Sequence, residues 1–89
     1  MSIYYRTKDG QADYQFSFEQ TDKGWRAYIL SQPGYRGRDT DLVPTHRKVA
    51  GGRYYVCWTE RLDSEEEARW VAARWADATQ EYIRSGQRF

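Results

Sequence analysis

The stretch Asp13–Gln20, DYQFSFEQ, alternates between aromatic and polar side chains along most of its length. Successive side chains of a β-strand point to opposite faces of the sheet, so the pattern predicts a strand with Tyr14, Phe16 and Phe18 on one face. An aromatic face of this kind is stable only when a second layer of secondary structure covers it. The rest of the chain must therefore supply that layer.

A helix late in the sequence can provide the cover. Ser64 is a typical N-cap residue, and Glu67 three positions later completes a capping box. Gly86 is a typical residue just beyond a helix end, so we predict a helix from about Glu65 to Ser85. Its apolar residues recur at helical spacing and form one stripe: Ala68, Val71, Ala72, Trp75, Ala78, Thr79, Tyr82 and Ile83.

Further strands are predicted on both sides of Asp13–Gln20. The segments Ser2–Lys8 and Trp25–Ser31 are rich in residues that favour strands. Gly51-Gly52 fits a two-residue hairpin turn, because both glycines can adopt positive φ. That turn would pair the weakly strand-like residues 45–50 with residues 53–57 and place His46 opposite Cys57.

These elements predict an α+β fold, in which an antiparallel meander of four to five strands carries one C-terminal α-helix packed on one face. The chain has 89 residues and no repeat or linker, so we expect one domain spanning residues 1–89. The predicted core contains Tyr14, Phe16, Phe18, Trp25, Ile29, Tyr54, Val56 and Trp58 from the sheet, with Val71, Trp75 and Tyr82 from the helix.

Charge and composition exclude several classes of protein. The 14 basic and 13 acidic residues give a net charge of +1, so the chain is not a globally basic nucleic-acid binder. The single cysteine allows no internal disulfide, which fits a reducing compartment. No apolar run approaches the roughly 18 residues of a membrane span, and the first ten residues lack a signal-peptide core. We expect a cytoplasmic protein without membrane contact.

Catalytic and metal chemistry have little support in the sequence. A metal site needs three or four convergent ligands, and the chain has one histidine and one cysteine. The hairpin register places His46 beside Cys57, as a thiol enzyme would require, but Cys57 also fits as a small residue within a strand. We therefore expect no catalytic residue, metal or cofactor, and keep a Cys57–His46 enzyme as a third hypothesis.

The first hypothesis is association with a protein partner or with a second copy. A single helix leaves the other sheet face uncovered, and Tyr28, Leu30 and Tyr55 are predicted to lie there. Trp70 lies on the helix opposite its apolar stripe, next to Arg74, and tryptophan is enriched at binding hot spots. The alternatives are that Trp70 lies flat on Arg74 in a cation–π contact and that the tyrosines only stabilise the sheet.

The second hypothesis is nucleic-acid binding. Residues 36–53 carry five basic and two acidic side chains, a local charge of +3. A basic segment can lie along phosphates while Tyr28 and Tyr55 stack on bases. The alternative is a solvated loop, since residues 35–48 have no predicted structural role. The basic candidates are Arg36, Arg38, Arg47, Lys48 and Arg53.

Overall fold

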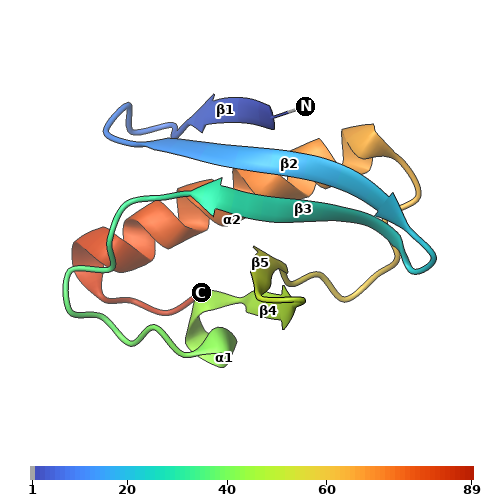
Figure 1. Cartoon of the computed structure of the whole chain (residues 1–89). Coiled ribbons are helices and arrows are strands. Elements are labelled where there is room, and N and C mark those ends of the chain that lie inside the picture. The colour runs from blue at the N-terminus through green and yellow to red at the C-terminus, as the bar shows by residue number, and fades with distance from the viewer. Residues whose placement is uncertain (1) are drawn as a thin grey trace.

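The computed structural model describes residues 2–89, which form a five-stranded antiparallel sheet and two helices (Figure 1). Neither helix in these residues is long and apolar enough to cross a membrane. The α+β fold, the antiparallel sheet and the single C-terminal helix on one face are confirmed. The elements are β1 (Ser2–Arg6), β2 (Asp13–Thr21), β3 (Gly24–Ser31), α1 (Leu42–Thr45), β4 (Arg47–Ala50), β5 (Arg53–Val56) and α2 (Glu65–Ser85).

The strands follow the order β1-β2-β3-β5-β4. A simple meander would place β4 beside β3, but here β5 takes that position and β4 lies at the edge. The register of the last hairpin is the predicted one, with Lys48 opposite Tyr55 and Val49 opposite Tyr54. The N–H of Cys57 donates to the main-chain oxygen of His46 over 2.9 Å, which extends this pairing by one residue.

Helix α2 begins and ends at the predicted residues. The Ser64 side chain accepts a hydrogen bond from the N–H of Glu67, and Gly86 ends the helix with φ of 78°. The N–H of Gly86 donates to the main-chain oxygen of Tyr82 over 2.8 Å. Glycine suits this position because it lacks the Cβ that opposes positive φ.

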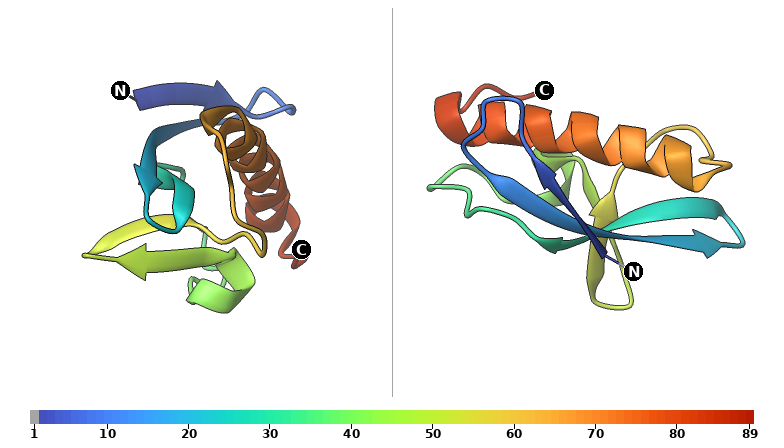
Figure 2. Two further views of the ribbon diagram at one scale, coloured as in Figure 1. Left: turned by 90° about the vertical axis from the view of Figure 1, so that its right-hand side faces the viewer. Right: turned by 90° about the horizontal axis from the view of Figure 1, so that it is seen from above.

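The core lies between α2 and the aromatic face of β2 and β3 (Figure 2). Tyr14 and Phe16 are fully buried, and the Trp75 ring meets both of them edge to face, at centroid distances of 5.8 and 6.0 Å. The Trp75 Nε1–H donates to the main-chain oxygen of Thr45 over 2.9 Å. One side chain therefore connects α2, β2 and the segment that precedes β4.

The prediction that Tyr54 and Trp58 belong to the core is wrong. They retain 43% and 38% of their accessible surface, whereas Val56 between them is buried. The β4–β5 hairpin extends beyond the region that α2 covers (Figure 2). Tyr54 is the second residue of β5, close to the hairpin turn. Trp58 follows the end of β5, and its orientation is no longer set by strand alternation.

The expectation that residues 35–48 have no structural role is also wrong. The Arg38 guanidinium donates to the main-chain oxygens of Ile83 and Arg84, each over 3.2 Å. The Tyr82 hydroxyl donates to the main-chain oxygen of Asp39 over 2.8 Å. Together with the Trp75 bond to Thr45, these contacts fasten Arg38, Asp39 and Thr45 to the second half of α2.

A close approach at the start of β3 gives a test of the packing. Gly24 has φ of +99°, and a Cβ there would lie 2.7 Å from the main-chain oxygen of Leu62. We expect Gly24→Ala to lower the free energy of unfolding by about 2–4 kcal/mol, from backbone strain and a main-chain clash together. Gly10 has φ of +71°, but a Cβ added there would meet nothing within 4 Å, so Gly10→Ala should cost only about 1 kcal/mol. Equal urea-denaturation midpoints for the two variants would contradict the close packing.

Candidate functional site

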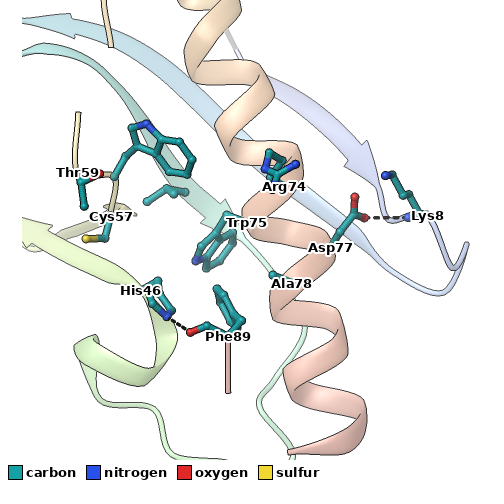
Figure 3. Close-up of a pocket in the computed structure, with 11 residues that line it drawn as sticks. Lys8, His46, Cys57, Thr59, Arg74, Trp75, Asp77, Ala78 and Phe89 are labelled. Carbon is teal, nitrogen blue, oxygen red and sulfur yellow. Dashed lines mark hydrogen bonds between the residues drawn. The ribbon is translucent and has the colours of Figure 1, made fainter. Parts of the chain in front are cut away.

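A cavity of about 570 Å³ opens along one side of α2, and we call it the aromatic groove (Figure 3). Part of it lies between the helix and the chain that leaves β5, where Phe89 also lies, and part of it extends across the helix to Asp77 and Lys8 (Figure 3). Its lining includes Lys8, His46, Val56, Cys57, Trp58, Thr59, Arg74, Trp75, Asp77, Ala78 and Phe89. These residues come from distant parts of the sequence, so only the tertiary structure brings them together.

At one end of the groove, His46 contacts Phe89 in two ways. The two rings lie 4.4 Å apart between centroids, and His46 Nε2 is 2.5 Å from the main-chain oxygen of Phe89. Tyr82 meets the Phe89 ring edge to face at 6.4 Å. His46 itself is held by its backbone, which has φ of 51° and ends α1. This end of the groove therefore already holds an aromatic residue by its ring and by its main chain.

At the other end, Trp58 and Trp70 form an edge-to-face pair with ring centroids 5.9 Å apart. We call it the tryptophan pair. Trp70 is 56% exposed, and the Arg74 guanidinium carbon lies 4.8 Å from the centre of its ring. The predicted exposure of Trp70 and its predicted cation–π contact with Arg74 thus occur together. Because Arg74 also lines the groove, the pair and the groove form one continuous surface.

Of the charged side chains that line the groove, Asp77 has hydrogen-bond partners, whereas Lys8 and Arg74 form no salt bridge within residues 2–89. Asp77 accepts hydrogen bonds from the Tyr5 hydroxyl and from the main-chain N–H of Lys8, over 2.8 and 2.9 Å. Burial, followed by the Asp77 hydrogen bond and charge, raises the pKa of Tyr5 to about 12. Among residues 2–89, the side chains of Lys8 and Arg74 form no salt bridge. The groove therefore presents two cations whose charge is not neutralised by a contacting carboxylate.

Cys57 and His46 both line the groove, but their side chains are not hydrogen bonded to each other in the described part of the chain. The His46 ring is engaged with Phe89, and the link between the two residues is the main-chain bond already described. No cluster of three or more His, Cys, Asp or Glu side chains that could hold a metal ion is found among residues 2–89.

The sheet face away from α2 is covered by the chain's own arginines. The Arg53 guanidinium carbon lies 3.9 Å from the centre of the Tyr28 ring, and that of Arg26 lies 4.4 Å from the Tyr55 ring. Tyr28 is only 6% exposed. Arg53 also binds Glu19 through two hydrogen bonds, of 3.2 and 2.6 Å, which lower the pKa of that carboxyl. A base could not stack on Tyr28 unless Arg53 moved away.

Several of the basic candidates have internal partners. Arg38 binds the end of α2, and Arg47 donates to Thr45 Oγ1 and to the main-chain oxygen of Thr40, over 2.9 and 2.7 Å. Arg36 and Lys48 are exposed. Three of the five basic candidates, Arg38, Arg47 and Arg53, therefore make contacts within the domain. The other two, Arg36 and Lys48, face solvent.

The candidates for a protein interface fall into separate groups. Trp70 and Arg74 touch each other beside the groove, whereas Tyr28 and Tyr55 touch each other on the far sheet face. Leu30 is exposed at a β-bulge, since the neighbours Gln15 and Phe16 pair with Ser31 and Ile29 and skip Leu30. Sequence reasoning missed Trp58 and Asp77. The polar run that follows Trp58, TERLDSEEE, was a signal that the strand ends near it.

Comparison of the chain with protein-family models, with curated proteins and with solved structures found no match.

The contacts of Arg38 predict that this residue stabilises the fold. We expect Arg38→Ala to lower the free energy of unfolding by about 1–2 kcal/mol, because two main-chain oxygens at the end of α2 lose a charged donor. Arg36→Ala removes the same charge from the same segment, but Arg36 is exposed, and we expect a change within about 0.5 kcal/mol. Urea denaturation of both variants checks this, and an equal loss of stability would contradict the assigned role.

The raised pKa of Tyr5 predicts a loss of stability at high pH. Its neutral form is favoured in the folded state, so this contribution is present below pH 10 and is lost as pH rises toward the folded pKa of about 12. We expect the free energy of unfolding to fall less steeply over this range in Tyr5→Phe than in the wild type. Tyr14 and Tyr35, whose pKa values are also raised by burial, remain in both proteins and serve as an internal control. Identical pH profiles would show that Tyr5 ionises normally.

Proposed function

We propose that this protein is a small non-enzymatic binding domain that associates with a protein partner through the tryptophan pair and the adjoining aromatic groove. One observation carries the proposal. Trp58 and Trp70 contact each other on the outside of the domain with 38% and 56% of their surfaces exposed. The core is built from other residues, so the fold does not require two tryptophans at this place.

The energetic argument follows from the size of the two rings. A tryptophan side chain presents up to about 250 Å², and apolar area removed from water contributes roughly 25 cal/mol per Å². Covering the exposed parts of both rings would then contribute on the order of 5 kcal/mol. Trp70 is also held by Arg74 and Trp58, so little rotamer freedom remains to be lost when a partner binds.

The surroundings of Trp70 favour a protein over a nucleic acid. A second, smaller hollow beside Trp70 is lined by Ser64, Glu66 and Glu67. These carboxylates would repel phosphates that approached the exposed ring. On the far sheet face, the faces of Tyr28 and Tyr55 are covered by arginines, so that surface contributes less to the proposal than Trp70 does.

Nucleic-acid binding remains the second candidate, and one observation favours it. Arg74 lies over the Trp70 ring, Lys8 also lines the groove, and neither forms a salt bridge in the part of the chain that the structure describes. Cations next to stacking platforms suit single strands. Binding of this kind would weaken steeply as salt is added.

The test is quantitative affinity capture from a lysate of the source organism, alongside sedimentation of the purified protein to measure self-association. We expect Trp70→Ala and Trp58→Ala each to lower capture of a specific protein about tenfold or more, the effect of removing a hot-spot residue. Tyr4→Ala is the matched control, because Tyr4 is an aromatic residue 68% exposed on β1. It points to the opposite face of that strand from Tyr5, whose hydroxyl contacts Asp77 of α2.

Unchanged capture by both tryptophan variants would contradict the proposal. Capture that disappears after nuclease treatment and at moderate salt would support the second candidate instead. A concentration-dependent mass that Trp70→Ala abolishes would identify the partner as a second copy of the chain.

A further inference from the structure

The contacts of the aromatic groove point to a more specific ligand. We propose that the groove receives an aromatic side chain of a partner polypeptide, with a carboxylate close to that side chain in the same partner, and that Phe89 occupies part of this site in the unbound protein. The inference rests on the proposed protein-binding function and deepens it.

The first argument is that the groove already holds a residue of the required kind. His46 contacts the ring of Phe89 at 4.4 Å and its main-chain oxygen at 2.5 Å. A peptide residue bound from outside would offer the same two features, a ring and a main-chain acceptor. His46 is well placed to serve both, because its N–H donates to Val43 and its main-chain oxygen accepts from Cys57.

The second argument is the space that remains. The cavity measures about 570 Å³ with Phe89 in place, and its walls include Val56, Trp58, Trp75 and Ala78. An apolar cavity of roughly 150 Å³ is large enough to bind benzene. The groove can therefore accept an aromatic ring together with the main chain on either side of it. Phe89 is itself 43% exposed, so its contacts are incomplete and a partner could displace it.

The third argument is charge complementarity. The Asp77 carboxylate is already hydrogen bonded to Tyr5 and to the main chain of Lys8. Lys8 and Arg74 add two positive charges, and neither forms a salt bridge within residues 2–89. The Arg74 guanidinium carbon lies 4.8 Å from the centre of the Trp70 ring, and its N–H groups make no hydrogen bond within residues 2–89, so they are available to a carboxylate. A ligand with an acidic residue beside its aromatic one meets both requirements.

The test is a titration of the isotope-labelled full chain with capped tetrapeptides, followed by NMR. The probe is acetyl-Gly-Phe-Glu-Gly-amide. One control peptide replaces its phenylalanine with alanine, another replaces its glutamate with lysine, and a thymidine dinucleotide tests the nucleic-acid alternative. We expect the Phe–Glu peptide to shift the indole N–H signals of Trp58 and Trp75 and the amide signals of His46 and Cys57. Both control peptides should bind several-fold more weakly.

Variants separate the parts of the site. Phe89→Ala should raise the affinity for the Phe–Glu peptide about three- to tenfold, because the binding-competent groove is then more highly populated. Arg74→Gln should weaken the preference for glutamate over lysine several-fold and keep the preference for phenylalanine over alanine. Tyr4→Ala should bind like the wild type. If Phe89→Ala proves poorly folded, Phe89→Leu keeps the apolar bulk and removes only the ring contacts with His46 and Tyr82.

No groove shift with the Phe–Glu peptide in either the wild type or a folded Phe89 variant would overturn the inference, and so would groove shifts with the dinucleotide alone. These results are distinct from failure of the proposed function. If lysate capture still depends on Trp58 and Trp70 while no tetrapeptide binds, the domain binds proteins through the tryptophan pair and the groove is not the recognition site.

Discussion

The hydrogen bond from the buried Trp75 indole to the main-chain oxygen of Thr45 determines how the two parts of the chain meet. Thr45 is fully buried, so its carbonyl would lose considerable free energy without a donor. The bond fixes α1 against the middle of α2, and α1 in turn fixes where β4 begins. The β4–β5 hairpin is thereby set to one side of the helix, and the space between them becomes the aromatic groove.

The parts of the fold that could be predicted are those encoded in neighbouring residues. Strand β2 followed from alternation, α2 from Ser64 and Gly86, and the last hairpin from Gly51-Gly52, each to within about a residue. The placement of β5 beside β3 has no local signal, because it results from how residues 32–46 dock on α2. Trp58 shows the same limit. Trp58 is two residues after the buried Val56, so strand alternation predicts that both point into the core. Strand β5 ends at Val56, however, and Trp58 no longer follows the alternation.

The candidate site divides in the same way. Helical periodicity alone placed Trp70 and Arg74 together on the outer side of α2, where the structure has them. The groove beside them could not be predicted, since residues as distant as Lys8, Trp58 and Phe89 line it. Strand alternation predicted that Tyr28 and Tyr55 share the face away from the helix, but their direct pairing requires β5 beside β3. Their cover of arginine side chains depends on rotamers that no strand pattern encodes.

Arginines lie over aromatic rings on both sides of this molecule, but the two sides differ in whether the arginine is also paired with a carboxylate. Arg53 lies on Tyr28, and its charge is neutralised by Glu19, so ring and cation satisfy each other and the surface is closed. Arg74 lies over Trp70, but Arg74 forms no salt bridge among residues 2–89, and Trp70 stays 56% exposed. The tryptophan pair therefore leaves apolar surface beside a cation without a salt bridge, and a partner can cover the apolar surface and bind the cation together. This contrast is why the α2 side of the molecule, and not the uncovered sheet face, is the surface through which we expect it to act.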